Sequence, residues 1–233
     1  MLSYENVRHA FGERVVLDGC TFSVRAGECV ALLGQSGAGK TTLFRLAYGA
    51  FDPDEGTVRV GGVDLRGVHG AALRQVRARI GVVFQAHELI DELSVEANVL
   101  AGTFGRRTTL GAIRSVLRPS ALERRLAHDA LARVGLGDRV RERAYHLSGG
   151  QRQRIAVARA IAARAELVLA DEPAASLDPS LAREIVDLLT ADARERGAAL
   201  VCTLHQPELA RSFDRVITLE AGRIVRDAVA GAA

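Results

Sequence analysis

The stretch that decides the fold of this chain is Gly34-Gln35-Ser36-Gly37-Ala38-Gly39-Lys40-Thr41-Thr42. It follows the apolar run Cys29–Leu33, which is typical of a buried strand, and it precedes Leu43–Ala47, which is typical of a helix. A glycine-rich turn between a strand and a helix directs free backbone N–H groups one way, at the positive end of the helix dipole. The stretch therefore predicts a phosphate-binding loop in an α/β fold.

The spacing in this loop is that of the Walker A motif: Gly34, four intervening residues, then Gly39-Lys40-Thr41. We expect Lys40 to reach the β- and γ-phosphates of a nucleotide and the Thr41 hydroxyl to hold Mg²⁺. Lys40 is also the only lysine among the 31 basic residues. A compact ammonium fits beneath a phosphate chain where a broad guanidinium does not, so keeping one lysine here favours nucleotide binding.

Composition limits the class of protein. With 233 residues, 48% of them hydrophobic, the chain can bury one substantial core with a small added lobe. The net charge is +3, and the arginine pairs Arg106-Arg107 and Arg124-Arg125 are too dispersed for a nucleic-acid surface, so we interpret them as solvated and expect no nucleic-acid partner. Cys20, Cys29 and Cys202 lack metal-ligand spacing and predict buried thiols in a reducing compartment.

Neither a signal-peptide pattern nor an apolar run of the ~20 residues needed to span a bilayer is present, which predicts a soluble protein. Residues 1–28 alternate as strands do, and Phe11 lies in their first turn. Two interpretations of Phe11 remain open: an aromatic ring that stacks on a nucleobase, or a hydrophobic residue under a hairpin. Residues 227–233 predict a short frayed tail.

Helical spacing replaces strand patterns from about residue 86 to residue 164, which predicts a helical lobe inserted into the α/β core. Ser94 can cap a helix over 95–100, and Leu110, Ile113 and Leu117 form an apolar stripe. Ser148-Gly149-Gly150-Gln151 opens a further helix, with Ser148 as its N-cap. This is a second helix terminus suited to phosphate.

Polar residues stand at the ends of the remaining predicted strands. The buried strand over 166–170 ends in Asp171-Glu172, the Walker B position, where Asp171 is expected to bind Mg²⁺ and Glu172 to polarise a water aimed at the γ-phosphate. Gln85 ends the strand over 80–84 and His205 ends the strand over 199–204. Parallel sheets place ligand-facing residues at such ends, which favours γ-phosphate contact for His205.

Taken together, these motifs resemble the ATP-binding cassette (ABC) transporter ATPases over essentially the whole chain. Phe11 matches the aromatic A-loop, where tyrosine is usual, and Gln85 matches the Q-loop. Residues 147–151 match the signature, 167–172 Walker B, 176–178 the D-loop, and His205 the switch histidine. The resemblance implies a P-loop NTPase with a RecA-like core and an antiparallel β subdomain (1–85 and 165–233) and an inserted helical subdomain (about 86–164).

The resemblance also implies a head-to-tail homodimer with two ATP molecules at its interface, Mg²⁺ as cofactor, and location at the cytoplasmic face of the membrane. The implied partners are integral membrane permease subunits and, indirectly, a periplasmic or surface solute-binding protein. Glu172, His205 and Gln85 are the implied catalytic residues, and Thr41, Gln85 and Asp171 the implied Mg²⁺ ligands. The implied ATP contacts come from Phe11 and residues 34–42 of one subunit and from Ser148, Gly149, Gly150, Gln151 and Asp178 of the other.

Within that family, residues 98–102, 169–179 and 204–206 look like the phosphonate importer ATPases, although Pro207-Glu208 departs from their usual pattern. We therefore expect an importer for phosphonate or a related oxyanion. An export, lipoprotein-release or cell-division ATPase of the same fold remains an alternative. The intact Glu172 and His205 argue against a nucleotide-dependent scaffold with little turnover, and the lack of a long heptad insertion within 86–147 argues against a DNA-repair ATPase.

Overall fold

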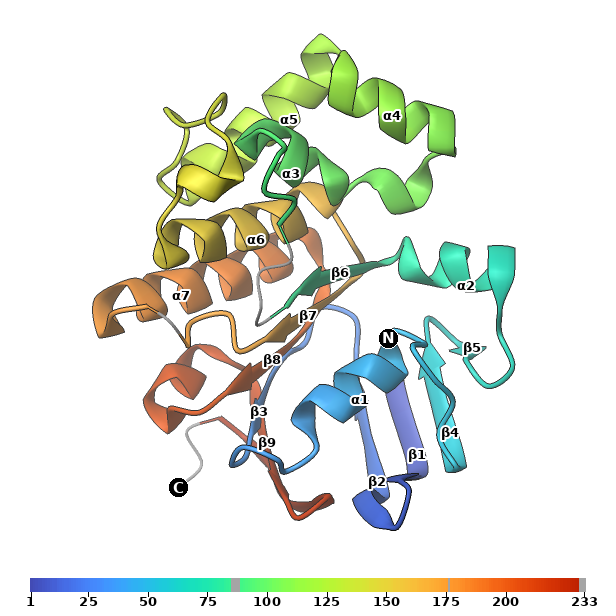
Figure 1. Cartoon of the computed structure of the whole chain (residues 1–233). Coiled ribbons are helices and arrows are strands. Elements are labelled where there is room, and N and C mark those ends of the chain that lie inside the picture. The colour runs from blue at the N-terminus through green and yellow to red at the C-terminus, as the bar shows by residue number, and fades with distance from the viewer. Residues whose placement is uncertain (85–88, 176, 231–233) are drawn as a thin grey trace.

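The computed structural model describes residues 1–84, 89–175 and 177–230, and within them the chain forms two sheets (Figure 1). The central sheet has six strands in the order β10-β9-β3-β8-β7-β6, and the second has four in the order β2-β1-β4-β5. The central strands are β3 (Cys29–Leu33), β6 (Ile80–Val83), β7 (Leu167–Asp171), β8 (Ala199–Leu204), β9 (Arg215–Glu220) and β10 (Arg223–Val229). The others are β1 (Leu2–Phe11), β2 (Arg14–Val24), β4 (Glu55–Val60) and β5 (Val63–Asp64).

Five neighbouring strands of the central sheet, from β9 to β6, run parallel, and β10 pairs antiparallel with β9. Their carboxyl ends consequently lie along one edge. β8 pairs with β3 on one side and with β7 on the other, so the segments that follow these three strands meet at that edge. The predicted strand boundaries are confirmed to within one or two residues for β3, β6, β7 and β8.

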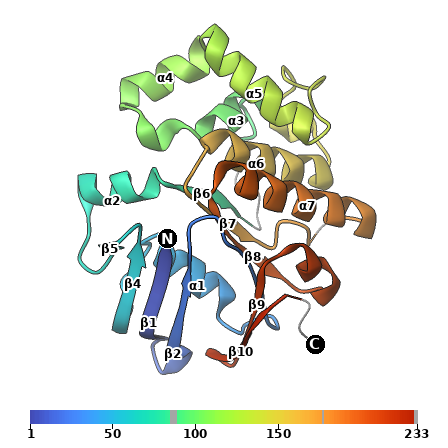
Figure 2. The same cartoon turned by 180° about the vertical axis from the view of Figure 1, so that it is seen from behind.

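The inner strands β3, β7 and β8 of the central sheet are buried on both faces. Ala31 of β3 and Leu200 of β8 join one apolar cluster with helices α6 (Gly149–Ala163) and α7 (Pro179–Arg196). Val30 and Val201 join a second cluster with α1 (Lys40–Ala47) and the four-stranded sheet. The views from front and back show these two layers on opposite sides of the sheet (Figures 1 and 2). Burial on both faces explains why these strands are apolar runs without alternation.

The predicted helical lobe is present as α3 (Val95–Ala101), α4 (Thr109–Leu117), α5 (Ala121–Arg133) and α6, joined by the short helices η1 (Phe104–Arg106) and η2 (Ala144–His146). Ser94 caps α3 as predicted, because its hydroxyl accepts from the N–H of Ala97. The apolar stripe of α4 is also present but faces solvent: Leu110 is 81% exposed and Leu117 is 74% exposed. The remaining elements are α2 (Gly70–Arg77) and η3 (Pro207–Ser212).

Two sequence interpretations need correction. Asp227 does not begin a frayed tail, because β10 continues to Val229 and Arg215 forms an ion pair with Asp227. Arg107 is not simply solvated, because its Nη1 lies 2.5 Å from the Oε1 of Glu123, a carboxylate that is only 5% exposed. Both partnerships join residues distant in sequence, so local charge patterns do not indicate them. The three cysteines are buried and free, as predicted.

Glu123 is the most strongly perturbed carboxylate that the structure describes. Its burial alone would raise the pKa, but hydrogen bonds from Ser120 and the charge of Arg107 outweigh burial and lower the pKa to about 2. The Ser120 N–H donates to Glu123 Oε2 at 2.6 Å, and the Glu123 N–H donates back to Ser120 Oγ at 3.3 Å, which forms a capping box at the start of α5. Arg114 also reaches this carboxylate, at 3.2 Å.

We expect Glu123→Gln to lower the free energy of unfolding by about 2 kcal/mol at pH 7. This is less than the energy equivalent to the whole pKa shift, because solvent reaches Arg107 and Arg114 and screens their charges. A carboxylate whose folded pKa is lowered stabilises the protein above its unfolded pKa and loses that effect as the pH falls through the folded pKa. The difference between wild type and variant should therefore shrink as pH falls from about 5 toward 2. Urea unfolding at several pH values measures this difference, with the exposed Glu184→Gln on α7 as control. A difference that stays constant with pH would contradict the account.

Candidate active site

The phosphate-binding loop lies between β3 and α1. Two of its glycines are required because a side chain would clash with neighbouring backbone and because their φ angles are positive. A Cβ on Gly34 would lie 2.5 Å from the carbonyl oxygen of Leu219, and one on Gly39 would lie 2.9 Å from that of Val16. Gly39, with φ of 111°, precedes the first residue of α1, which is Lys40. Neighbouring backbone therefore presses on the loop from two sides and fixes its path beneath the helix N-terminus.

Lys40 is buried, with 4% of its surface exposed, and its ammonium donates to two carbonyls of the loop itself. Nζ lies 2.6 Å from the oxygen of Gly34 and 3.2 Å from that of Gln35. Burial lowers the pKa of Lys40 below its usual value, although the carboxylates of Glu172 and Asp171 act in the opposite direction. Nζ is 4.0 Å from Glu172 Oε1. The loop therefore holds a buried cation among two of its own carbonyl oxygens and the carboxylate of Glu172.

Asp171, the last residue of β7, is held at both carboxylate oxygens. The Thr41 hydroxyl donates to Oδ2 at 2.9 Å, and the Thr203 hydroxyl donates to Oδ1 at 2.8 Å. Mg²⁺ prefers hard oxygen ligands and is usually held by one or two protein groups together with substrate phosphates and water. Thr41, in the first turn of α1, and Asp171, at the end of β7, are in contact and fit that requirement.

Glu172 turns sharply away from Asp171. Its φ of 50° is left-handed, a conformation that costs roughly 1–2 kcal/mol for a residue with a side chain. The Glu172 N–H donates to Thr203 Oγ1 at 2.8 Å, which secures the turn. Its Oε1 lies 2.5 Å from Nε2 of His205, the residue that follows β8. The turn therefore separates the two acids, so that one faces Thr41 and the other faces the histidine and Lys40.

Thr203 is a site residue that the sequence reasoning missed. It is fully buried in β8, accepts from the backbone of Glu172 and donates to Asp171. A signal was available, since Thr203 is a polar residue in an apolar strand, one residue before the strand's end. That pattern alone does not identify which neighbouring group it binds.

Removing this hydroxyl should slow hydrolysis without abolishing nucleotide binding. We expect Thr203→Val to lower kcat about ten- to a hundredfold, because one hydrogen bond to a charged group is worth about 1.5–3 kcal/mol. Steady-state phosphate release measures the effect. Thr190→Val is the matched control, since Thr190 is equally buried but donates to helix carbonyls of α7. Equal loss of kcat in both variants would show that Thr203 acts through stability alone.

The residues assigned to a second half-site cluster elsewhere. Ser148 and Gln151 form a capping box at the start of α6: the Gln151 N–H donates to Ser148 Oγ at 3.4 Å and the Ser148 N–H donates to Gln151 Oε1 at 3.0 Å. Asp178 caps α7 through the N–H groups of Ser180 and Leu181, both at 3.1 Å. A Cβ on Gly150 would lie 3.2 Å from Leu177, so these two helix starts are neighbours. No hydrogen bond or ion pair that the structure describes joins them to residues 34–42.

Phe11 ends β1 with 52% of its surface exposed and packs against His9 and Phe51. The ring therefore packs on neighbouring rings and keeps an exposed surface, and stacking of Phe11 on a nucleobase stays a prediction. Gln85 and Ser176 lie outside the described residues, so the Q-loop assignment and the first D-loop residue stay predictions.

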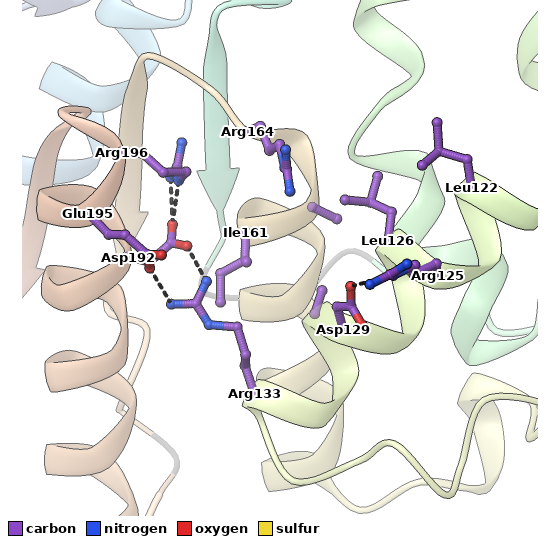
Figure 3. Close-up of a pocket in the computed structure, with 12 residues that line it drawn as sticks. Leu122, Arg125, Leu126, Asp129, Arg133, Ile161, Arg164, Asp192, Glu195 and Arg196 are labelled. Carbon is purple, nitrogen blue, oxygen red and sulfur yellow. Dashed lines mark hydrogen bonds and ion pairs between the residues drawn. The ribbon is translucent and has the colours of Figure 1, made fainter.

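A separate groove of about 630 Å³ lies between α5, α6 and α7, away from the phosphate-binding loop (Figure 3). Asp192 of α7 is buried in its wall and pairs with Arg133 of α5 and with Arg196, each at 2.5 Å. Leu126 and Ile161 supply apolar wall (Figure 3). The Arg133–Asp192 pair joins the helical lobe to α7, whereas the Asp192–Arg196 pair lies within α7 itself.

Comparison with known proteins gives one family. The profile of the family described as "ABC transporter" matches residues 17–175. The chain is 45% identical over 229 residues to the phosphonates import ATP-binding protein PhnC of Frankia casuarinae, covering 98% of this chain and 90% of that protein. It is 42% identical to the hypophosphite import ATP-binding protein HtxD of Stutzerimonas stutzeri, covering 97% of this chain and 66% of that protein.

Solved structures agree with the fold. The dimeric structure of MJ0796, titled a bacterial ABC transporter cassette, superposes with a TM-score of 0.89 at 29% identity and covers 100% of both chains. A second structure of MJ0796, titled a dimeric post-hydrolysis state bound to ADP and Pi, superposes with a TM-score of 0.87 over the same coverage. The predicted fold class is thereby confirmed.

Proposed function

Because this chain belongs to the ABC transporter family of ATP-binding proteins, and is therefore an ATPase, we propose that it energises the import of phosphonate or a related phosphorus oxyanion. The observation that carries the ATPase assignment is the meeting of the segments that follow three neighbouring strands. Lys40 and Thr41 begin α1, after the loop that follows β3. They lie beside Asp171 and Glu172 at the end of β7, and Glu172 in turn meets His205, which follows β8.

The geometry divides the work among these residues. Lys40 neutralises the β- and γ-phosphate oxygens, exchanging its carbonyl partners for them. Thr41 and Asp171 hold Mg²⁺, which when bound supplies positive charge to the phosphate oxygens. Glu172 accepts the proton of the attacking water, and His205 holds the Glu172 carboxylate and meets the γ-phosphate. Gln85 is proposed as a further Mg²⁺ ligand and catalytic residue.

We further propose that the active form is a head-to-tail homodimer. Two phosphate-suited helix starts occur in one chain but pack in different places, which a second copy would reconcile by placing Ser148, Gly149, Gly150, Gln151 and Asp178 against the nucleotide of the first. In this arrangement residues 1–233 act as one ABC ATPase domain. The core is 1–85 with 165–233, and residues of about 86–164 form the helical subdomain.

Import requires partners that cross the membrane, since none of the helices in the described part of this chain is long and apolar enough to do so. We propose permease subunits that hold the chain at the cytoplasmic face, and a solute-binding protein that delivers the substrate to them. The names of the relatives, phosphonates import and hypophosphite import proteins, support an oxyanion of phosphorus as the solute.

Reconstitution tests this function. The chain is assembled with its permease subunits and binding protein in liposomes, and ATP-dependent uptake of labelled methylphosphonate is measured. We expect uptake that competes with hypophosphite or another phosphonate but not with sulfate. Vigorous ATP hydrolysis that no phosphorus oxyanion stimulates would overturn the substrate class and leave the ATPase assignment standing.

A further inference from the structure

A buried histidine lies directly beneath Phe11. His9 is only 7% exposed, and its ring stacks on Phe51 at a centroid distance of 4.7 Å and an interplanar angle of 18°. Phe11 meets His9 edge to face, at 4.8 Å and 88°, and meets Phe51 at 5.7 Å and 79°. Three rings from β1 and from the segment after α1 thus form one cluster, of which Phe11 is the half-exposed member.

The two ring nitrogens of His9 are buried, and no group in the described part of the chain satisfies their hydrogen-bonding capacity. Neither ring nitrogen has a hydrogen-bond partner among the described residues, and Nδ1 lies 3.6 Å from Oδ2 of Asp54. That same Oδ2 accepts from the Ala10 N–H at 2.7 Å, while the Asp54 N–H donates to the oxygen of Arg8 at 3.0 Å. Asp54 therefore fastens the backbone on both sides of His9 and fixes where the imidazole lies.

We propose that His9 is a positioning residue for the nucleobase. Together with Phe51 it forms a second layer that holds the Phe11 ring in one orientation, so that the exposed surface of Phe11 is ready to stack on the adenine of ATP. Without that layer, Phe11 would sample several rotamers and lose freedom on binding, which weakens stacking. This inference rests on the proposed function as an ATPase and on the expectation from the sequence that Phe11 stacks on the base.

The test distinguishes binding of the base from binding of the phosphates. The dissociation constants of ATP and of inorganic tripolyphosphate, which has no base, are measured with the full chain and its variants. We expect His9→Ala to raise the dissociation constant of ATP about three- to tenfold, in line with the strength of aromatic pairs, and to leave tripolyphosphate binding unchanged. His9→Phe should restore ATP binding, because it keeps the stacked ring. In a Phe11→Ala background, His9→Ala should cause no further loss of ATP affinity.

Matched variants keep the test decisive. If His9→Ala does not fold, Phe51→Leu removes the other ring of the second layer and should give the same loss for ATP alone. Phe22→Leu is the control, because it breaks a comparable stack, Phe22 on Tyr4 at 4.5 Å, elsewhere in the same sheet. The control should lower stability without changing the ratio of ATP to tripolyphosphate affinity.

Three results would overturn the inference: equal weakening of ATP and tripolyphosphate by His9→Ala, an additive loss in the Phe11→Ala background, or no loss at all. If Phe11→Ala weakens ATP but His9→Ala does not, only the second layer fails. If Phe11→Ala leaves ATP affinity intact, the base-stacking part of the proposed function fails with it.

Discussion

Glu172→Gln is expected to lower steady-state ATP hydrolysis by about a hundred- to a ten-thousandfold, the range that a general base contributes. The amide cannot take the proton of the attacking water. It keeps the shape of the side chain, and the backbone N–H that donates to Thr203 at 2.8 Å is unchanged, so the left-handed turn survives. Nucleotide binding should therefore persist while the chemical step stops.

Phosphate release measures the rate, and light scattering with saturating MgATP measures the assembly. We propose that hydrolysis of ATP releases the two copies from each other. We therefore expect the variant to remain as an ATP-bound dimer. Glu166→Gln is the matched control: Glu166 immediately precedes β7, where it pairs with Arg79 at 2.7 Å, at the end of the strand opposite the site. Turnover near the wild-type rate would contradict the role of Glu172, and a monomer with bound ATP would contradict the dimer.

The second large effect is expected from Lys40→Arg, a substitution that keeps the charge. ATP affinity should fall about thirty- to a hundredfold, equivalent to about 2–3 kcal/mol. The ammonium sits 2.6 Å from Gly34 O in a loop that neighbouring backbone compresses at Gly34 and Gly39. A planar guanidinium is larger and presents a fixed fork of donors, so it cannot occupy the same space without displacing the loop.

Titration calorimetry with ATP measures this loss, and tripolyphosphate should show the same loss because the defect lies at the phosphates. The control exchanges the residues in the opposite sense: Arg45→Lys, on the exposed side of α1 one turn further along, should leave affinity unchanged. Unaltered ATP binding in Lys40→Arg would refute the interpretation that this lone lysine is kept for its shape.

Much of the fold could be predicted from the sequence because its signals are local. The caps Ser94 and Ser148 each accept from a backbone N–H three residues away, and both are confirmed. Apolar runs likewise predicted β7 and β8, and hence that Asp171 and His205 stand at the ends of strands. Spacing within a few residues determines these features.

What the sequence could not supply are partnerships between distant segments. Thr203 binds Asp171 across 32 positions and His205 meets Glu172 only because β8 lies beside β7. The exposure of the α4 stripe also escaped prediction, because helical spacing reveals an apolar face but not whether another element covers it. The role of Ser148 toward ATP stays a prediction, since it depends on a second copy.

The hydroxyl of Thr203 touches both the side chain of one acid and the backbone of the next. Thr203 therefore links the proposed Mg²⁺ ligand to the proposed proton acceptor through one hydroxyl. If Asp171 moves when it takes up the metal, we expect the orientation of Glu172 to change with it.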